Sequence, residues 1–288
     1  MILIADSGST KCDWVLVEND GTQICEAQST GLNPLILNEN ELEETILKID
    51  LLIEKKTLVD KIYFYGAGCG EIEAKNRIRK VLTNIFKYAG VTVEEDTFAA
   101  VRACTNQPAV VCILGTGSNC SFFNGTGIIQ KIPALGYLLA DEGSGNYFGK
   151  RLLKDFYEKT MPENLTRKFK KEYPQNLNTV LEELYGNKYP NKYLADYALF
   201  LFKNRGDDYV ENLLHEGIEK YVFTFLHKYH EEASIYPIHF VGSVAYHAQD
   251  IIIKIVRELG YEIRSFVKKP INGMVVNIVN EKREQVNQ

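Results

Sequence analysis

Several classes of protein are excluded by what this sequence lacks. Cysteine is scarce, with 6 in 288 residues, and no two cysteines form a Cys-x-x-Cys pair, so neither a zinc site nor a disulfide framework is expected. Apolar runs stay far below the ~18 residues of a membrane span, and no basic leader precedes the first apolar stretch. We therefore expect a cytoplasmic protein of a reducing compartment, with no membrane partner.

The sequence also lacks the Gly-x-x-x-x-Gly-Lys-Ser/Thr motif, which excludes a Walker-type nucleotide enzyme. It has no basic excess, because 33 basic and 38 acidic residues leave a formal net charge of −5. The short basic run Arg167 to Lys171 is typical of a solvated helix face, so no nucleic acid is expected as a partner. With 45% hydrophobic and 25% charged residues, the chain has the composition of an ordinary globular protein of one large or two medium domains.

The order of apolar and turn segments predicts an α/β fold with mixed sheets. The first ~30 residues read as three antiparallel strands, because Asp20-Gly21 separates two alternating runs. These strands are predicted at Ile2–Ala5, Cys12–Val17 and Thr22–Ala27. Crossover helices at about Asn40–Lys55 and Glu71–Tyr88 then alternate with strands Lys61–Tyr65 and Val91–Glu94, and a short helix follows Asp96.

The same pattern restarts about a hundred residues later, which indicates a duplicated domain. Its three opening strands are predicted at Val110–Leu114, Cys120–Phe123 and Ile128–Ile132. Later strands are predicted at Ile238–Val241 and Tyr261–Val267. Helices are predicted at Gly145–Lys159, Tyr193–Lys203, Asp208–Glu232 and Val244–Leu259, and from Pro270 onward. The polar stretch Asn164–Lys192 has the character of an insertion.

Two turns of small residues occupy equivalent places in the two halves. They are Asp6-Ser-Gly8-Ser-Thr10 and Gly115-Thr116-Gly117-Ser118-Asn119. Glycine lets backbone N–H groups approach an anion, hydroxyls add donors, and a carboxylate at a strand end can hold Mg²⁺ through water. Each turn alone can be an ordinary hairpin, but two such hairpins together would form a phosphate clamp.

Two further glycine segments lie where a strand enters a helix. Phe240-Val-Gly242-Ser243-Val244 presents a flat glycine surface that suits the ribose or base of a nucleotide, although a plain strand–helix junction has the same composition. Gly66-Ala-Gly68-Cys-Gly70 fails as a dinucleotide fingerprint, because Glu71 stands where the third glycine belongs. We interpret that segment as a strand-to-helix turn.

Taken in order, the two hairpins and the Gly242 junction resemble the phosphate-1, phosphate-2 and adenosine motifs of the ASKHA superfamily, over nearly the whole chain. Ile113-Leu-Gly-Thr-Gly-Ser-Asn-Cys120 and Gly136-Tyr-Leu-Leu-Ala-Asp-Glu-Gly-Ser144 are similar to the BadF/BadG/BcrA/BcrD ATPase family, in its N-acetylglucosamine kinase branch. The resemblance implies two ribonuclease H-like domains of the actin/hexokinase/Hsp70 type, with mixed sheets flanked by helices and a cleft between them. The implied domains are residues 1–105 and 106–288, with the terminal helix 270–283 packing back on the first.

The resemblance also implies roles for individual residues. Asp6 would organise Mg²⁺, and Asp96 would be the catalytic base. The residues that would bind ATP are Gly8, Ser9, Thr10, Lys11, Gly115, Thr116, Gly117, Gly242 and Ser243. The residues that would bind the sugar are Asn33, Ser118, Asn119, Gly136 and Asp141.

These assignments predict an ATP- and Mg²⁺-dependent kinase that phosphorylates an amino sugar, N-acetylglucosamine at O6, with a homodimer as a possible assembly. Two local alternatives stay open, because Asp96 and Asp141 could each cap the helix that follows. The substrate loop departs from the family, since Leu135-Gly136 stands where many members have Trp-Gly. An ATPase or conformational regulator without a sugar substrate is the alternative function.

Overall fold

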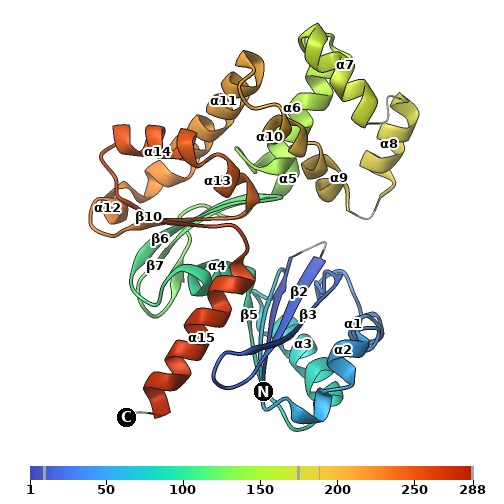
Figure 1. The fold of residues 1–288 in the computed structure, drawn as a ribbon, viewed down its shortest axis with the longest axis vertical. Helices are drawn as coiled ribbons and strands as arrows, with labels where there is room; N and C mark the ends of the chain where they lie inside the picture. Colours follow the sequence, from blue (N-terminus) through green and yellow to red (C-terminus); the bar gives the residue numbers. More distant parts are fainter. Residues whose placement is uncertain (9–10, 174–175, 188, 287–288) are drawn as a thin grey trace. The chain divides into compact units, whose positions relative to one another are not determined.

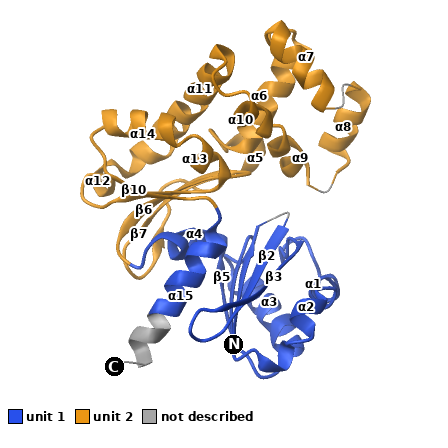
Figure 2. Cartoon of the chain, viewed as in Figure 1, with its two compact units in different colours: residues 1–106, 269–288 blue, residues 107–268 orange. Residues whose placement is uncertain are grey.

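The computed structural model describes residues 1–8, 11–173, 176–187 and 189–286. The chain divides into two compact units (Figures 1 and 2). Unit 1 comprises residues 1–106 and 269–288, and unit 2 comprises residues 107–268. Each unit is built on one five-stranded mixed sheet flanked by helices.

The sheet of unit 1 has the order β3-β2-β1-β4-β5. Its strands are β1 Ile2–Ser7, β2 Lys11–Val17, β3 Gln23–Thr30, β4 Lys61–Gly66 and β5 Gly90–Glu95. The first three strands pair antiparallel, whereas β4 and β5 lie parallel to β1. The carboxyl ends of the three parallel strands therefore meet at one edge of the sheet.

Helices cover this sheet because their apolar residues recur at helical spacing and are buried, those of α1 to α3 in one core with the strands and those of α4 and α15 beside it. They are α1 Glu39–Leu47, α2 Asp50–Ile53, the 3₁₀ turn η1 Lys56–Leu58, α3 Ile72–Ile85, α4 Asp96–Cys104 and α15 Pro270–Val286. The α15 helix is contributed by the end of the chain and lies against α4 (Figure 1). The centre of the core holds Trp14, whose ring centroid is 6.1 Å from that of Phe64.

The sheet of unit 2 repeats this arrangement in the order β8-β7-β6-β9-β10. Its strands are β6 Ala109–Leu114, β7 Ser118–Phe123, β8 Ile128–Ile129, β9 Ile238–Val241 and β10 Ile263–Val267. As in unit 1, the first three strands pair antiparallel, and the last two lie parallel to the central β6. The duplication predicted from the turn pattern is therefore a duplication of sheet topology.

Most helices of unit 2 fall between β8 and β9. They are α5 Gly136–Leu139, α6 Gly145–Tyr157, α7 Glu163–Glu172, α8 Leu177–Tyr185, α9 Pro190–Asp196, α10 Leu199–Lys203, α11 Asp208–Thr224, η2 Leu226–Tyr229 and α12 His230–Ala233. Two more, α13 Ser243–His247 and α14 Gln249–Glu258, lie between β9 and β10. Their apolar faces form one continuous core with the sheet, and the insertion-like stretch is mainly the helices α7 and α8.

Four predicted helices are interrupted in the structure, and one of them, the segment 208–232, divides into α11, η2 and α12. The segment 40–55 breaks after α1, where Ile49 leaves the helical conformation (φ −94°, ψ 79°) and is buried. The segment 244–259 breaks at Ala248 (φ −108°, ψ 22°), between α13 and α14, and the segment 193–203 is split between α9 and α10. No proline or glycine lies at these breaks. Tertiary burial, rather than local helix propensity, therefore determines where these helices are interrupted.

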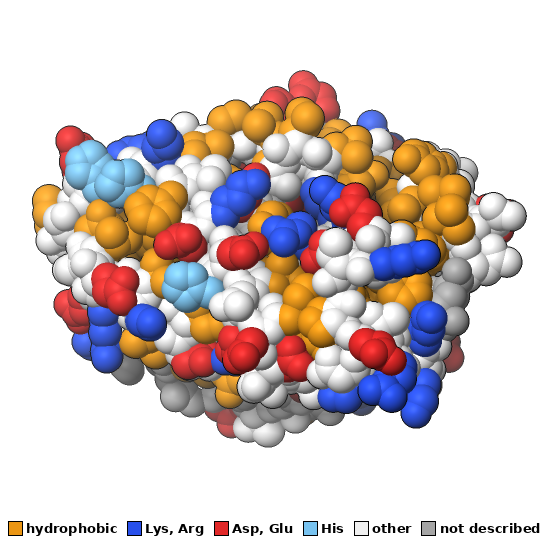
Figure 3. Space-filling view, turned by 90° about the horizontal axis from the view of Figure 1, so that it is seen from above, with side chains coloured by type: hydrophobic (Ala, Val, Ile, Leu, Met, Phe, Trp, Pro, Cys, Tyr) orange, Lys and Arg blue, Asp and Glu red, His pale blue; other side chains and the backbone are white. Residues whose placement is uncertain are grey.

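The surface carries charges of both signs, and Figure 3 shows Lys and Arg interspersed with Asp and Glu on one face. None of the six cysteines, all of which are described, forms a disulfide, and four of them are buried. Within the described part of the chain, no helix combines the length and the apolar character needed to cross a membrane.

Candidate active site

The carboxyl edge of the unit 1 sheet gathers most of the polar residues predicted for that half of the chain. The register pairs Ser7 of β1 with Gly66 of β4, and Gly66 with Glu95 of β5. Asp6 therefore lies at one side of this edge and Asp96 at the other, with the Gly66–Gly70 turn between them. Because neighbouring strands are about 4.8 Å apart, the backbones that carry the two aspartates are separated by roughly 10 Å.

Asp6 belongs to β1 itself, rather than to the turn after it as predicted, and lies directly opposite Asp13 of β2. Lys11 forms an ion pair with Asp13, with an Nζ–Oδ2 distance of 2.7 Å. The pKa of Asp6 is raised to about 7, first by desolvation and then by repulsion from Asp13 and Asp96, while Lys11 opposes the shift. The sheet register thus places two carboxylates beside a single ammonium group.

Asp96 is the first residue of α4, and its side chain is exposed. The N-cap position belongs to Glu95, which makes no side-chain cap bond, so the alternative of Asp96 as the N-cap is wrong. Although water reaches its carboxylate, the surrounding protein removes part of the hydration shell. The pKa of Asp96 rises to about 6, through this desolvation and through repulsion from Glu95. Beside it, the buried Oγ1 of Thr97 has no hydrogen-bond partner among the described residues.

The position of α4, and with it that of Asp96, is fixed by α15. Gly273 packs so closely on Ala103 that a Cβ atom at Gly273 would overlap the Ala103 carbonyl and lie 2.8 Å from its carbon. Asn277 donates through Nδ2 to the carbonyl oxygen of Arg102, at 2.6 Å, near the end of α4. The last helix of the chain therefore braces the helix on which the predicted base stands.

Asn33 lies in the turn between β3 and α1, against the Gly66–Gly70 turn. Its Oδ1 accepts a hydrogen bond from the backbone N–H of Leu35 at 2.9 Å. Gly68 has a positive φ of 80°, and a Cβ atom there would overlap Oδ1 of Asn33 and lie 2.8 Å from its Cγ. Gly68 is therefore needed both for the backbone turn and for the close approach of Asn33. Asn33 is half-buried, so part of its amide remains open to a ligand.

The predicted phosphate-1 hairpin is described only at its two ends. The space beside the Cα atom of Gly8 is open, because a Cβ atom there would meet nothing closer than the Lys11 carbonyl oxygen at 3.8 Å. Ser9 and Thr10 lie outside the described residues. The exposed Lys11 begins β2, where it forms the ion pair with Asp13 described above.

In unit 2, the equivalent turn follows β6. Only Gly115, Thr116 and Gly117 form this turn, since Ser118 and Asn119 belong to β7 rather than to the turn as predicted. The carbonyls of Gly115 and Thr116 accept from backbone N–H groups in the first turn of α6, at 2.8 and 3.0 Å. The N–H groups of Thr116 and Gly117 have no partner in the described part of the chain, and both residues are accessible to solvent. The turn is thus rigid and still presents free donors to an anion.

Asp141 supports this turn through hydrogen bonds to the residues beside it. It is buried, adopts a positive φ of 71°, and accepts from the Ser118 backbone N–H at 3.0 Å and from Nδ2 of Asn146 at 2.9 Å. A Cβ atom on Gly117 would lie 2.9 Å from its carboxylate. The alternative of Asp141 as a helix cap is wrong, because Ser144 caps α6 by accepting from the Tyr147 N–H.

Two acceptors beside Asp141 stay open among the described residues. Oγ of Ser118 and Oδ1 of Asn146 are buried and make no hydrogen bond within the described chain. Asn119 differs, because its own Oδ1 accepts from the Cys120 N–H at 2.7 Å. Buried polar atoms without partners are uncommon in native proteins, so this corner fits a ligand or a water molecule that donates hydrogen bonds.

Gly136 begins the short helix α5 with a positive φ of 72°, and a Cβ atom there would meet no other atom within 4 Å. Nζ of Lys150 donates to the carbonyl oxygen of Tyr137 at 2.6 Å and holds this segment. Leu135, the residue in place of the family's tryptophan, is 53% exposed. The segment therefore offers an apolar surface rather than a packed core element.

Gly242 lies where β9 enters α13, with a positive φ of 113°. A Cβ atom there would overlap the Leu114 carbonyl and lie 3.0 Å from the Gly115 backbone nitrogen. Only glycine can hold this junction so close to the phosphate-2 turn. The following Ser243 is exposed, and unit 2 therefore brings two of its predicted nucleotide motifs together.

A comparison with solved structures decides the family. A crystal structure of the "putative N-acetylglucosamine kinase" from Porphyromonas gingivalis is 30% identical, with a TM-score of 0.89, and the match covers 97% of this chain and 99% of that one. The chain belongs to the same family of sugar kinases. No family model matches the sequence of this sugar kinase.

Two more distant structures share the fold of the sugar kinase. One is the "putative N-acetylglucosamine kinase" from Chromobacterium violaceum, at 15% identity and a TM-score of 0.70, with 96% of this chain and 98% of that chain covered. The other is a ROK family glucokinase from Streptomyces griseus in complex with glucose and AMPPNP, at 14% identity and a TM-score of 0.57, with 98% and 99% covered. The two-domain ASKHA fold predicted from the motifs is therefore confirmed.

The residues of the sugar kinase fit a magnesium ion that arrives with a nucleotide. Among the described residues, no group of three or more His, Cys, Asp or Glu side chains could hold a metal alone. Asp6 and Asp13, however, together carry more negative charge than the single ammonium group of Lys11 can neutralise. Mg²⁺ keeps several waters and is commonly bound by one or two carboxylates together with substrate phosphates.

Sequence reasoning missed three residues that contact or adjoin the candidate site residues in the structure. Asp13 could have been found, because pairing β1 with β2 across the predicted hairpin puts it opposite Asp6. Gly68 was dismissed with the failed dinucleotide fingerprint, although it packs on Asn33. Asn146 had no signal in the sequence, since its role depends on how α6 meets the phosphate-2 turn.

Proposed function

We propose that this protein transfers the γ-phosphoryl group of ATP to an amino sugar, and that the acceptor is the 6-hydroxyl of N-acetylglucosamine. The observation that carries the proposal is the placement of Asp96, an accessible carboxylate at the strand edge shared with Asp6 and with the Asn33–Gly68 contact. Family membership supports it, because the P. gingivalis relative is described as a putative kinase of this sugar.

Unit 1 would bind and activate the acceptor. The half-buried Asn33 amide would hydrogen-bond a sugar hydroxyl, in an orientation fixed by Leu35 and Gly68. Asp96 would accept the proton of the 6-hydroxyl and hold that hydroxyl in line. Its raised pKa of about 6 suits a general base near neutral pH, where it is ionised and still basic enough to take a proton.

Unit 2 would bind the nucleotide and complete the sugar contacts. The free N–H groups of Thr116 and Gly117 would donate to phosphate oxygens, with Gly115 leaving room for them. Gly242 and Ser243 would face the adenosine. Ser118, Asn119, Gly136 and Asp141 would line the part of the site that holds the sugar.

In the transfer step, the acceptor oxygen forms a bond to the γ-phosphorus while the bond from that phosphorus to the bridging oxygen breaks, and ADP leaves. The hydroxyl proton goes to the carboxylate of Asp96. Little covalent chemistry is needed from the protein, which aligns the two substrates. Mg²⁺, when bound, would neutralise charge on the phosphates, and Asp6 would orient it, while Gly8, Ser9, Thr10 and Lys11 would bind phosphate on the side of unit 1.

The test is the Asp96→Asn variant with Glu95→Gln as the matched control, each assayed for ATP consumption with N-acetylglucosamine. Loss of the base should lower kcat by about 10²–10⁴-fold, with little change in ATP affinity. Glu95→Gln also removes one carboxylate at this edge and should keep kcat within a few-fold. If Asp96→Asn keeps more than about a tenth of kcat, Asp96 is not the base.

A screen against N-acetylmannosamine, N-acetylgalactosamine, glucosamine, glucose and N-acetylmuramic acid tests the acceptor. N-acetylglucosamine should give the highest kcat/KM. If no sugar raises ATP turnover above background hydrolysis, the protein is an ATPase or conformational regulator instead.

We also assign the chain to the BadF/BadG/BcrA/BcrD branch of the ASKHA superfamily and to the cytoplasm. The paired motifs Ile113–Cys120 and Gly136–Ser144 support the branch. The cysteines, which form no disulfide among the described residues, support a reducing compartment.

A further inference from the structure

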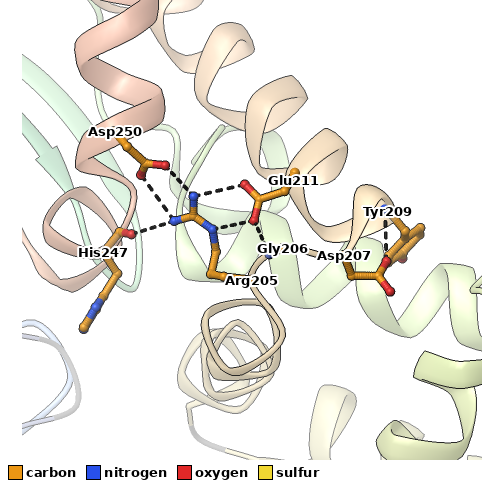
Figure 4. Close-up of polar contacts among 7 residues, drawn as sticks. All are labelled: Arg205, Gly206, Asp207, Tyr209, Glu211, His247 and Asp250. Atoms are coloured by element: carbon orange, nitrogen blue, oxygen red, sulfur yellow. Dashed lines mark hydrogen bonds and ion pairs between the residues drawn. The ribbon is translucent and has the colours of Figure 1, made fainter.

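One ion-pair cluster in unit 2 lies outside the residues assigned so far. It centres on Arg205, in the turn that joins α10 to α11 (Figure 4). The guanidinium donates through Nε and Nη2 to Glu211, at 2.7 and 3.0 Å, and through Nη1 and Nη2 to Asp250, at 3.3 and 2.5 Å. Its Nη1 also donates to the backbone carbonyl of His247 at 3.1 Å.

These contacts use the whole guanidinium group. It has five N–H donors, and five hydrogen bonds to protein oxygens are present. Arg205 therefore has no donor left for a phosphate group. Its effect on any ligand must pass through the residues that it holds.

Arg205 holds the far end of α13, the helix that begins at the predicted adenosine motif. At the near end, Gly242 is fixed by its backbone N–H bond to Val267 (2.9 Å) and by its close approach to Leu114. At the far end, the arginine binds the carbonyl of His247, the last residue of α13. The short helix is therefore clamped at both ends.

The clamped segment presents an exposed surface. Ser243, Tyr246 and His247 are exposed. The His247 ring lies 5.3 Å from that of Phe202, which precedes Arg205 by three residues, and 5.6 Å from that of Tyr246. One side of this ring cluster thus comes from α10, whose last residue precedes Arg205 by two positions, so a shift of the turn that carries the arginine would be passed to the rings.

We propose that Arg205 is a positioning residue for the adenosine end of ATP, acting through α13 rather than touching the nucleotide. The inference rests on the proposed function, since it takes Gly242 and Ser243 to face the nucleotide. Both carboxylate partners have a lowered pKa because of the arginine, which keeps the cluster charged at neutral pH.

The test compares Arg205→Lys with the matched control Lys203→Met. Lysine keeps the charge but cannot reproduce the planar fork that holds two carboxylates and a carbonyl. Lys203 is the last residue of α10, two positions before Arg205, and pairs with Glu172 at 2.7 Å, in a contact that does not involve α13. Calorimetry should measure the Kd of ATP and of ADP, and kinetics should measure kcat and both KM values.

In Arg205→Lys, we expect Kd for ATP and for ADP to rise by the same factor, about tenfold or more. KM for ATP should follow, while kcat at saturating ATP and KM for the sugar stay within twofold. Lys203→Met should leave both Kd values within twofold. Asp250→Asn, a milder change, should move them in the same direction by less, which keeps the test open if Arg205→Lys folds poorly.

Two outcomes would overturn the inference. One is a lower melting temperature in Arg205→Lys with an unchanged Kd for ATP, as expected for a purely structural ion pair. The other is a wild-type protein that binds no ATP. A wild-type protein that binds ATP but phosphorylates no sugar would refute only the proposed function, because the binding comparison still tests the role of Arg205.

Discussion

The Gly68→Ala substitution tests the geometry of the acceptor site more directly than removal of a polar side chain. Alanine at a positive φ costs about 1–2 kcal/mol, and Gly68 has a φ of 80°. The new methyl group would also overlap Oδ1 of Asn33 and displace it. If the hydrogen bond from Leu35 to Asn33 is lost, a further ~1 kcal/mol follows. The free energy of unfolding should thus fall by about 2–3 kcal/mol, and the melting temperature by roughly 5–10 °C.

The same displacement should weaken sugar binding. A lost hydrogen bond of ~1–1.5 kcal/mol corresponds to about a tenfold higher KM for N-acetylglucosamine, with KM for ATP unchanged. Steady-state kinetics at saturating ATP and scanning calorimetry measure the two effects.

Gly70→Ala is the matched control in the same turn. A Cβ atom at Gly70 meets only Oε2 of Glu95, at an ordinary 3.5 Å, and the backbone φ is not positive. This variant should keep both KM values and its melting temperature. If Gly68→Ala melts earlier with an unchanged sugar KM, Asn33 does not contact the acceptor, and if neither quantity changes, the Gly68–Asn33 packing is refuted.

Three other perturbations test the remaining parts of the site. Asp6→Asn should abolish Mg²⁺-dependent turnover with the fold intact, and an unchanged Mg²⁺ titration would contradict the metal role. The carboxylates of Asp96 (pKa about 6) and Asp6 (pKa about 7) are both active only when ionised, so kcat/KM should rise with pH through steps near 6 and near 7 and level off at about pH 8. The residual activity of Asp96→Asn should lack the step near 6 and keep the step near 7. Gly273→Ala should destabilise unit 1 by about 1–3 kcal/mol through overlap with Ala103 and lower kcat, whereas Gly127→Ala, which meets no atom within 4 Å, should do neither in a melting and rate comparison.

The antiparallel hairpins that open both sheets could be predicted because they depend on local signals, whereas the order of the parallel strands joins residues far apart in the sequence. Alternating apolar residues and glycine turns specify each hairpin within a dozen residues, and the same signals recur in the second half. The helix breaks at Ile49 and Ala248 could not be predicted, since neither position carries a breaker. Those breaks follow from contacts with residues distant in the sequence, which local patterns do not encode.

The same distinction between local and distant signals applies to the residues of the candidate site. The glycine turns and the aspartates at strand ends were found because their residue types and neighbours are local. The Arg205 cluster was not found, because Glu211 is six residues away and Asp250 is forty-five residues away. An arginine in a polar turn reads as solvated, and only the packing of α11 and α14 shows which carboxylates surround it.

Asp141 shows why composition alone could not assign its role. The sequence allowed a helix cap or a sugar ligand, and the structure adds a third role, the bracing of the Gly115–Gly117 turn through Ser118 and Asn146. That role demands burial and a positive φ, which aspartate tolerates better than most residues. It also explains why Gly117 must be glycine, since a side chain there would collide with the carboxylate. Under the proposed roles of the Gly115–Gly117 turn and of Ser118, Asp141 would couple phosphate binding to sugar binding, because a shift in either ligand would move the same carboxylate.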